Sequence, residues 1–186
     1  MAAQPEVVVV SGHMVDTPDR PKPRFPPDQV PRVAAAVRSA FERWGVGPGT
    51  TLVTGGARGA DIVAAEEARA CGAALRLVLA LEPDEFVARS VAIPGTSWEQ
   101  RFRELLGHAD VEVVDGPDDD EVFARTNKRI IEVARGIDEQ PHAVIVWDGK
   151  QGDGPGGTLD FVSQLGHDLG DDGVVLIDPT PGQDLR

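Results

Sequence analysis

Short hydrophobic runs alternate along the chain with longer stretches in which apolar residues recur every three or four positions. The run Glu6–Val10 holds four consecutive valines bounded by a turn, which is typical of a strand buried on both faces of a parallel sheet. Further strands are predicted at Thr51–Thr54, Ala74–Leu81, Val111–Val114, His142–Trp147 and Val174–Ile177. Because helical stretches separate these runs, the order predicts right-handed crossovers and a mostly parallel sheet of six or seven strands, with helices on both faces.

The helical spacing is clearest between Val30 and Trp44, where Asp28 is a candidate N-cap and Gly45 a stop signal. Other helices are predicted over 62–71, 84–91, 98–106, 123–134 and 158–169. The segment 14–27 contains five prolines, so it cannot form a helix interior or a central strand and is expected to be an ordered loop. The predicted class is a three-layer α/β fold.

The chain length of 186 residues and a hydrophobic content of 41% fit one domain over residues 1–186, with a tail that frays from about 179. Its longest apolar runs are too short to cross a bilayer, and its N-terminus lacks the features of a secretory signal. The sequence therefore predicts a soluble, cytoplasmic protein with no membrane partner.

The formal net charge of −13 argues against nucleic acid as a partner, because nucleic-acid affinity comes largely from lysine and arginine. It leaves room for a small phosphorylated ligand, which aimed amides and one or two arginines hold at contact range. Basic charge gathers at Arg20, Lys22 and Arg24 in the proline-rich segment, where phosphate contacts are expected. The single cysteine and the lack of HExxH or CxxC motifs disfavour a metal site.

Two glycine-rich turns, Gly55–Asp61 and Gly154–Thr158, each join a predicted strand to a predicted helix. Glycines let the backbone approach a phosphate, and the helix that follows presents unpaired N–H groups at the same place. One such turn alone is as well explained by tight chain reversal, but two of them should converge with Ser11–His13 at the carboxyl edge of the sheet. Neither turn has the spacing of a dinucleotide fingerprint or a P-loop, which excludes an ordinary NAD dehydrogenase and a P-loop ATPase.

The candidate residues follow from these turns. The predicted ligand-binding residues are Gly12, His13, Arg24, Gly55, Gly56, Arg58, Gly59, Asp61, Gly156, Gly157 and Thr158. Asp61 can cap its helix or contact a ribose hydroxyl, and a Cβ at Gly56 is expected to fill the phosphate position. Asp148 and Asp160 are the carboxylates best placed for a catalytic role.

These residues resemble motifs of the SLOG superfamily, the Rossmann-like group that includes DprA/Smf proteins, LOG phosphoribohydrolases and molybdenum-cofactor carriers. The turn Gly55–Asp61 resembles the GGARGAD turn of the YspA-type branch, and Pro155–Thr158 resembles a shortened LOG loop. A wider pattern is similar to SLOG domains found beside bacterial cyclase, TIR or tetratricopeptide modules. It comprises Ser11–Met14 with Pro23–Pro26, then Glu85–Phe86 to Ser90–Val91, Trp98 with Arg101–Phe102, and Thr126–Asn127. The resemblance implies that the first, second and fifth strands lie side by side, so that the three glycine loops meet around one nucleotide-like ligand.

The chain departs from the LOG pattern at Phe161, where LOG enzymes carry a glutamate. The leading hypothesis is therefore a sensor or nucleotide-processing domain that binds a nucleotide or a nucleotide-derived ligand. The alternative is a LOG-like N-glycoside hydrolase acting on a nucleoside monophosphate or an NAD-like substrate. A third hypothesis is a non-catalytic carrier or scaffold. No cofactor beyond the nucleotide-like ligand is expected, and a homo-oligomer or a signalling-protein partner is possible.

Overall fold

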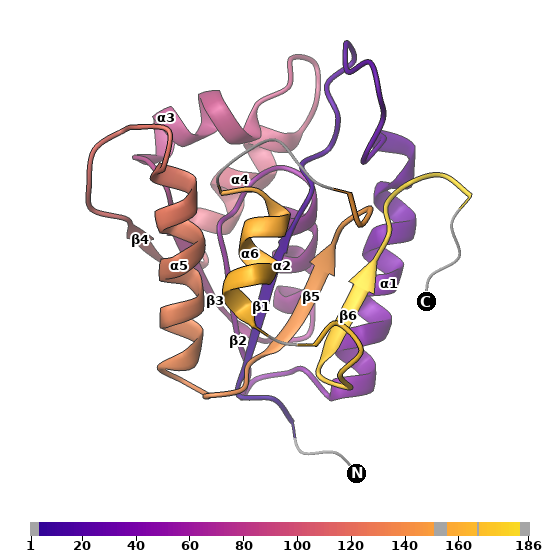
Figure 1. Ribbon diagram of the computed structural model, residues 1–186, viewed down its shortest axis with the longest axis vertical. Helices are drawn as coiled ribbons and strands as arrows, with labels where there is room; N and C mark the ends of the chain where they lie inside the picture. The colour runs from indigo at the N-terminus through magenta and orange to yellow at the C-terminus, as the bar shows by residue number, and fades with distance from the viewer. Residues whose placement is uncertain (1–3, 151–155, 167, 183–186) are drawn as a thin grey trace.

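The structure, a computed structural model, describes residues 4–150, 156–166 and 168–182. One six-stranded sheet runs through it in the order β4-β3-β2-β1-β5-β6, and every pair of neighbouring strands is parallel (Figure 1). The strands are β1 (Val7–Gly12), β2 (Thr51–Thr54), β3 (Ala74–Leu79), β4 (Ala109–Val113), β5 (His142–Val146) and β6 (Val174–Ile177). The predicted parallel sheet is confirmed, and β1 lies between β2 and β5 as the resemblance implied.

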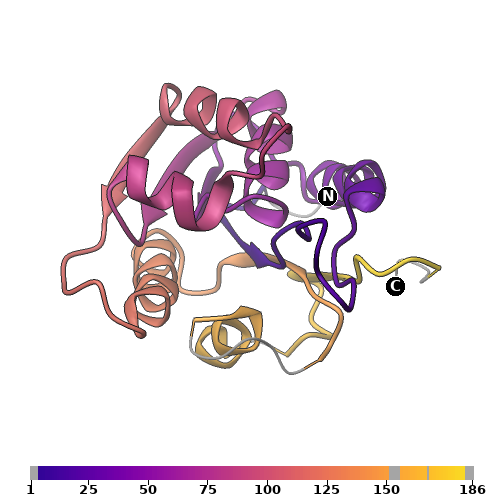
Figure 2. The same ribbon diagram turned by 90° about the horizontal axis from the view of Figure 1, so that it is seen from above.

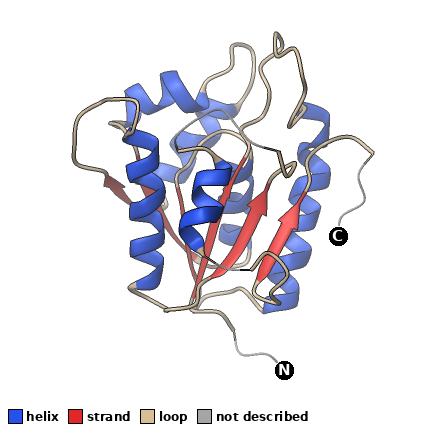
Figure 3. Ribbon diagram, in the orientation of Figure 1, coloured by secondary structure: helices blue, strands red, loops and turns tan. Residues whose placement is uncertain are grey.

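Helices cover both faces of the sheet (Figures 2 and 3). The helices are α1 (Val30–Trp44), α2 (Ala60–Ala70), α3 (Pro83–Phe86), α4 (Trp98–Leu106), α5 (Val122–Arg135) and α6 (Thr158–Leu165). A 3₁₀ turn, η1 (Pro27–Gln29), precedes α1, and a π-helical turn, η2 (Val87–Val91), follows α3. The three-layer α/β class is therefore confirmed.

The four valines of β1 show why both faces must be covered. Val8 and Val10 pack in a core layer with residues of α1, α2, α3 and α4, whereas Val7 and Val9 pack in a second layer with residues of α5 and α6. All four side chains are fully buried, because successive side chains of a strand point to opposite faces. A run of apolar residues without alternation is what a strand between two core layers requires.

Most element boundaries differ by a few residues from the sequence-based expectation, and three differences have a clear local cause. Asp28 does not cap α1, because Pro27 begins the 3₁₀ turn and Asp28 lies inside it. The helix α6 ends at Leu165 instead of Leu169, because Gly166 adopts a left-handed conformation with φ of 66°. The expected helix over 84–91 is an α turn followed by a π turn.

The start of the expected frayed tail is held in place. The guanidinium of Arg32 on α1 donates hydrogen bonds to the carbonyl oxygens of Asp178 at 2.8 Å and Thr180 at 3.0 Å. Residues 183–186 of that tail lie outside the described residues. The fraying predicted from about 179 therefore remains a prediction for the last residues only.

Candidate functional site

A cavity of about 300 Å³ lies at the carboxyl edge of the sheet, where the loops after β1, β2 and β5 converge. In the view onto this edge, β1 runs between the layer of α5 and α6 and the layer of α2 and α4 (Figure 2). Of the predicted ligand-binding residues, the cavity wall includes Gly12, His13, Arg24, Gly55, Asp61, Gly156, Gly157 and Thr158. Segments far apart in the sequence therefore share one cavity, because all strands end at the same edge.

The loop after β1 contributes a buried histidine. The amide of His13 donates to the carbonyl of Val146 at 2.8 Å, which ties this loop to the end of β5. The ring atom Nε2 lies 2.9 Å from Oδ1 of Asp148. The strand β1 ends at Gly12, where a Cβ would lie 2.5 Å from the carbonyl oxygen of Val146. Only glycine allows the two strand ends to approach this closely.

Arg24 of the proline-rich loop completes a cluster with His13 and Asp148. Its Nη2 donates to Oδ1 of Asp148 at 3.1 Å, and its Nε lies 3.4 Å from Oδ2. The loop itself is held by Asp16, whose Oδ2 accepts from the amides of Arg24 at 2.8 Å and Phe25 at 2.9 Å. The basic residue that the sequence singled out in this loop is therefore brought to the cavity.

Asp148 is the buried partner of both the His13 ring and the Arg24 guanidinium. Burial alone would raise its pKa, but hydrogen bonds from Arg24 and His13 outweigh that effect and hold the pKa well below its usual range. Burial lowers the pKa of His13, and the nearby charge of Arg24 lowers it further, against the raising effect of Asp148. Asp148 is thus ionised and His13 neutral at pH 7, an arrangement that orients the imidazole. Asp148 does not itself line the cavity.

The amides of the first glycine loop are largely occupied within the protein. Arg58 donates its backbone N–H to the carbonyl of Ser90 at 3.0 Å, and Ala60 donates to that of His13 at 3.3 Å. The amide of Ala57 donates to Oδ2 of Asp61 at 3.1 Å. This loop therefore offers a ligand fewer backbone donors than its sequence suggested.

Asp61 turns back from the start of α2 onto the loop that precedes it. Its side chain is buried and lines the cavity. Burial raises the pKa of Asp61 to about 7, although hydrogen bonds with the Ala57 amide, the Thr54 hydroxyl and the Gly56 amide favour its ionised form. Asp61 does not cap α2 as predicted, because the N-cap is Gly59 without a side-chain hydrogen bond and the contacts of Asp61 go to amides of the preceding loop.

Three residues of the first loop do not line the cavity. A Cβ at Gly56 would lie 3.2 Å from the ring of Phe102 on α4, so the expectation that it would fill a phosphate position is wrong. A Cβ at Gly59 would lie 2.7 Å from the backbone of both His13 and Val15, so this glycine allows close packing of two loops. Nε of Arg58 donates to the carbonyl of Val15 at 3.1 Å, which fixes the same loop.

The second glycine loop opens α6 onto the cavity. Gly156 has φ of 81°, and a Cβ there would lie 2.6 Å from the carbonyl carbon of Phe123 on α5. The described residues supply no acceptor for the backbone N–H groups of Thr158 and Leu159 in the first turn of α6. Such N–H groups, with the positive end of the helix dipole, favour an anion. Gly154 and Pro155 lie outside the described residues.

Asp160 is held at the contact between α5 and α6. Its Oδ2 accepts from Nδ2 of Asn127 at 2.9 Å and from Nε2 of Gln164 at 2.8 Å. Its side chain is absent from the cavity wall, where Asn127 and Thr158 appear instead. The two carboxylates predicted to be catalytic therefore both serve as hydrogen-bond acceptors beside the cavity.

The structure also brings residues to the cavity that the glycine loops did not indicate. Phe86 and Arg89, from α3 and the π turn, and Phe123, from α5, lie on its wall. The guanidinium carbon of Arg89 lies 5.5 Å from the centre of the Phe123 ring, so a cation and an aromatic face meet there. Their spacing in the sequence matches that of ordinary helix faces, so hydrophobic periodicity alone does not distinguish them from core or surface residues.

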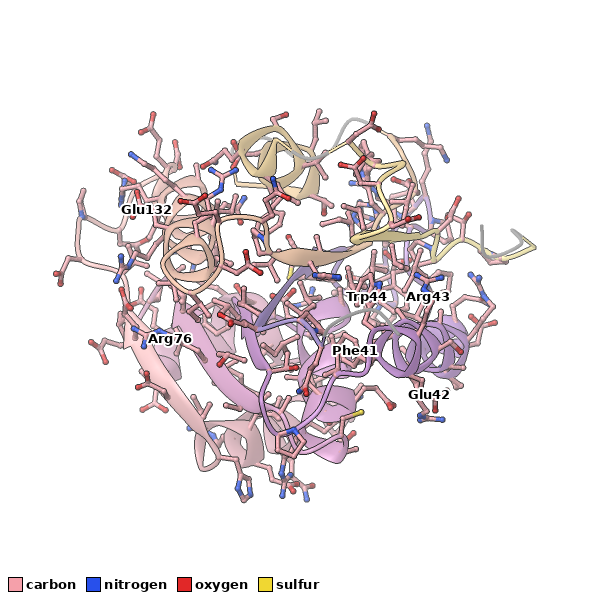
Figure 4. All side chains as sticks on the ribbon, turned by 90° about the horizontal axis from the view of Figure 1, so that it is seen from below. Phe41, Glu42, Arg43, Trp44, Arg76 and Glu132 are labelled. Carbon is pink, nitrogen blue, oxygen red and sulfur yellow. The ribbon has the colours of Figure 1, made fainter. Side chains whose placement is uncertain are left out.

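A larger, open hollow of about 1340 Å³ lies along α1 and the edge strand β6. Its wall includes Arg43 and Trp44, which are labelled at the end of α1 in the view from below (Figure 4). None of the predicted site residues lies on it. Among the described residues, no group of three or more metal-binding side chains is close enough to hold an ion, and no helix is long and apolar enough to cross a membrane.

A parallel sheet covered on both faces, with glycine loops around a cavity at its carboxyl edge, defines the Rossmann-like class of α/β folds. Within this class, the chain is similar to DNA processing protein A (DprA) from Streptococcus pneumoniae, known from an X-ray structure, with a TM-score of 0.52 and 16% sequence identity. The similarity covers 91% of this chain and 48% of that one, so the chain spans about half the length of the DprA chain. The similarity confirms the Rossmann-like α/β fold that the sequence predicted.

No protein-family model matches the chain, and neither does any curated protein.

Proposed function

We propose that this protein binds a nucleotide or a nucleotide-derived ligand in the cavity at the carboxyl edge of its sheet. The observation that carries the proposal is the convergence of the loops after β1, β2 and β5 on one cavity of about 300 Å³. Apolar walls with a few converging polar groups are typical of small-molecule sites, and the volume of this cavity lies at the lower end of the range usual for such sites. The Rossmann-like fold and the resemblance of the glycine turns to SLOG motifs support the same ligand class.

The second glycine loop, and not the first, holds the anionic group of the ligand. The anionic group of the ligand lies at the first turn of α6, where the amides of Thr158 and Leu159 have no acceptor among the described residues. Arg24, which also lines the cavity, adds positive charge. The base packs against Phe86 and Phe123, because aromatic side chains offer large apolar contact area.

Removing one amide donor tests this placement. Thr158 is the first residue of α6, and Gly157 before it is extended with ψ of −179°, so proline fits at position 158 and removes the N–H there. We expect Thr158→Pro to weaken binding at least about tenfold, because a charge-assisted hydrogen bond contributes about 1.5–3 kcal/mol. Thr158→Val is the matched control, since it removes the hydroxyl and keeps the N–H.

The measurement is isothermal titration with AMP, NAD, ADP-ribose and cyclic nucleotides. Equal affinity in Thr158→Pro and Thr158→Val would show that the amide does not hold the anion. Lack of binding by the unaltered protein across the whole panel would end the proposal and favour the carrier or scaffold hypothesis.

Binding without cleavage is proposed, because Asp148 and Asp160 both lie off the cavity wall and are engaged by other side chains. Chromatography after incubation with the same nucleotides separates the two functions. Release of free base that is lost in Asp148→Ala or Asp160→Ala would instead favour the LOG-like hydrolase. We expect the nucleotides to be recovered intact.

The similar protein, DprA, is by name a DNA processing protein, which makes DNA a ligand to test with this chain as well. We propose that this chain does not bind DNA, because its net charge of −13 opposes the phosphate backbone. An electrophoretic mobility assay with single-stranded and duplex DNA at low salt, where electrostatic attraction is strongest, checks this proposal. A shift that disappears with added salt would contradict it.

A further inference from the structure

We propose that Asp61 acts as a built-in hydrogen-bond acceptor at the first glycine loop, so that its end of the cavity selects a hydrogen-bond donor of the ligand, a hydroxyl or an amine, and excludes phosphate. This inference rests on the proposed function and specifies the ligand that the cavity accepts. It assigns different chemistry to two loops that look alike in sequence.

The first support is the position of the carboxylate. Oδ2 of Asp61 lies 3.1 Å from the amide nitrogen of Ala57, one of the donors that a phosphate on this loop would need. A Cβ at Gly55 would lie 3.2 Å from the same oxygen, so the glycine leaves room for the carboxylate in the turn. The carboxylate therefore occupies the concave side of the loop.

The second support is the engagement of the neighbouring donors. The amides of Arg58 and Ala60 donate to the carbonyls of Ser90 and His13. The hydroxyl of Thr54, which also approaches Asp61, has a carbonyl acceptor in Val10 at 3.0 Å. A hydroxyl carries only one proton to donate, so Thr54 cannot donate to both groups at once.

The third support is the charge of the wall. Among the described residues that line the cavity, Asp61 is the only carboxylate. A phosphate placed against it would bring its oxygens onto a carboxyl oxygen that already accepts from the Ala57 amide. As the pH rises through about 7, the phosphate would also meet a like charge in a buried setting, where repulsion is strong. A hydroxyl or amine would instead find a carboxylate oxygen as acceptor. The cavity thus has an acceptor end at Asp61 and a donor end at α6.

The ligand class follows from these two ends. It carries a hydroxyl-bearing or amine-bearing part and an anionic part, as a nucleoside monophosphate does with its ribose and its phosphate. With the phosphate at α6, the sugar hydroxyls or the amine of the base lie at Asp61. A ligand with phosphates at both ends would be rejected.

The first experiment uses inorganic phosphate, so it does not depend on any nucleotide being bound. The reference protein is Thr158→Pro, in which the anion position at α6 is impaired. Melting temperature is measured in phosphate and in chloride at equal ionic strength. We expect no stabilisation by phosphate in Thr158→Pro and a clear stabilisation in Thr158→Pro combined with Asp61→Ala, because the amides of Gly56 and Ala57, which Asp61 engages, become available.

The matched control is Asp84→Ala in the same Thr158→Pro protein. Asp84 is a carboxylate in the first turn of α3 that is exposed and paired with Arg103, so its loss also removes one carboxyl group but opens no loop. Should Asp61→Ala melt too early for the comparison, Asp61→Ser, which keeps a hydrogen-bonding group in the first turn of α2, replaces it. Absence of a phosphate effect in the Asp61 variants, or an equal effect in Asp84→Ala, overturns the inference.

The second experiment compares AMP with 2′,3′-dideoxy-AMP and with an AMP analogue that lacks the amine of the base. We expect the unaltered protein to prefer AMP to one of these analogues by about tenfold, and Asp61→Ala to lose that preference. Equal affinity of the unaltered protein for all three overturns the assignment of Asp61. If no nucleotide binds at all, the proposed function fails, and the phosphate experiment still decides the role of Asp61.

Discussion

At the scale of single residues, Asp61 illustrates how burial changes the way in which a folded chain holds a proton. In the unfolded chain its carboxyl titrates near the ordinary value of 3.8, whereas in the folded protein burial raises the pKa to about 7. The folded state therefore binds this proton more tightly than the unfolded state does. Its contribution to stability is fully present below pH 3.8 and is lost as the pH rises through 7.

Replacing Asp61 by asparagine should remove this pH dependence. Asparagine has the shape of the protonated carboxyl and keeps an oxygen for the Ala57 amide. We expect the difference in unfolding free energy, Asp61→Asn minus the unaltered protein, to rise by up to about 4 kcal/mol when the pH is raised from 4 to 8. Denaturant titrations at both pH values measure the difference. A constant difference between the two proteins would show that Asp61 does not titrate in this window.

The cluster of His13, Arg24 and Asp148 allows a second prediction at this scale. Arg24 lowers the pKa of His13 and Asp148 raises it. Accordingly, Arg24→Gln should raise the His13 pKa, and Asp148→Asn should lower it. NMR titration of the histidine ring follows both shifts, with the exposed Lys22→Gln as the control. Shifts of the same sign in both variants would contradict the assigned contacts.

Residue types alone predicted part of this site and missed the rest. Gly12, Asp61 and Thr158 could be placed at the cavity because each follows a predicted strand. The occupation of the Ala57 amide by Asp61 could not be predicted, because it depends on the path of the loop and not on its composition. Arg58 was predicted to bind phosphate because it lies within the glycine turn. Its side chain instead donates to the carbonyl of Val15, a contact that also depends on the path of the loop.

At the scale of elements, the loops are defined by how closely they approach the helices beside them. At Gly156, a Cβ would lie 2.6 Å from the carbonyl carbon of Phe123 and 2.7 Å from the amide nitrogen of Ala124. Backbone atoms cannot rotate away as a long side chain does. Position 156 of the second glycine loop therefore requires glycine for two reasons, its positive φ and its close contact with α5.

A pair of alanine substitutions separates these two requirements. Gly95 has φ of 77° and open space where a Cβ would lie, with no atom within 4 Å, whereas Gly156 has φ of 81° and the close contact with Phe123. Backbone strain should lower the free energy of unfolding by about 1 kcal/mol in both variants. In Gly156→Ala the clash with α5 should lower it by roughly a further 1–3 kcal/mol. Denaturant unfolding measures both. Equal losses would show that α5 yields easily at this contact.

Periodicity predicted the elements better than it predicted their ends. The runs of β2 and β6 were placed correctly because buried strands and turn residues are both local signals. The end of α6 was missed because Gly166 interrupts a pattern that continues to Leu169 in sequence. The π turn was also missed, since its bond from the Ala92 amide to the Val87 carbonyl at 2.8 Å leaves no mark on hydrophobic spacing.

At the scale of the whole molecule, the net charge of −13 acts against the compact state through self-repulsion. Salt bridges such as Arg76 with Glu112 and Arg38 with Glu67 offset it locally at partly exposed positions. Such pairs contribute little individually, so the long-range repulsion outweighs their loss when salt is added.

We therefore expect the melting temperature to rise by a few degrees, roughly, when sodium chloride increases from about 0.02 to 0.2 M, since the Debye length falls below the spacing of remote charges. Calorimetry or circular dichroism measures the change. The same series with potassium chloride separates screening from binding of a particular cation. A melting temperature that falls with salt would show that the ion pairs dominate.

The two core layers that meet at β1 also constrain how the length of the chain can change. Inserting or deleting one residue within Val7–Val10 would exchange the side chains that face the two layers, and every later contact of the strand would be mismatched. The loops at the carboxyl edge of the sheet have no such alternation of side chains between two layers, so a change in their length does not mismatch the core. Natural variants of this chain should therefore differ in loop length around the ligand, while the number of residues in its central strand stays constant.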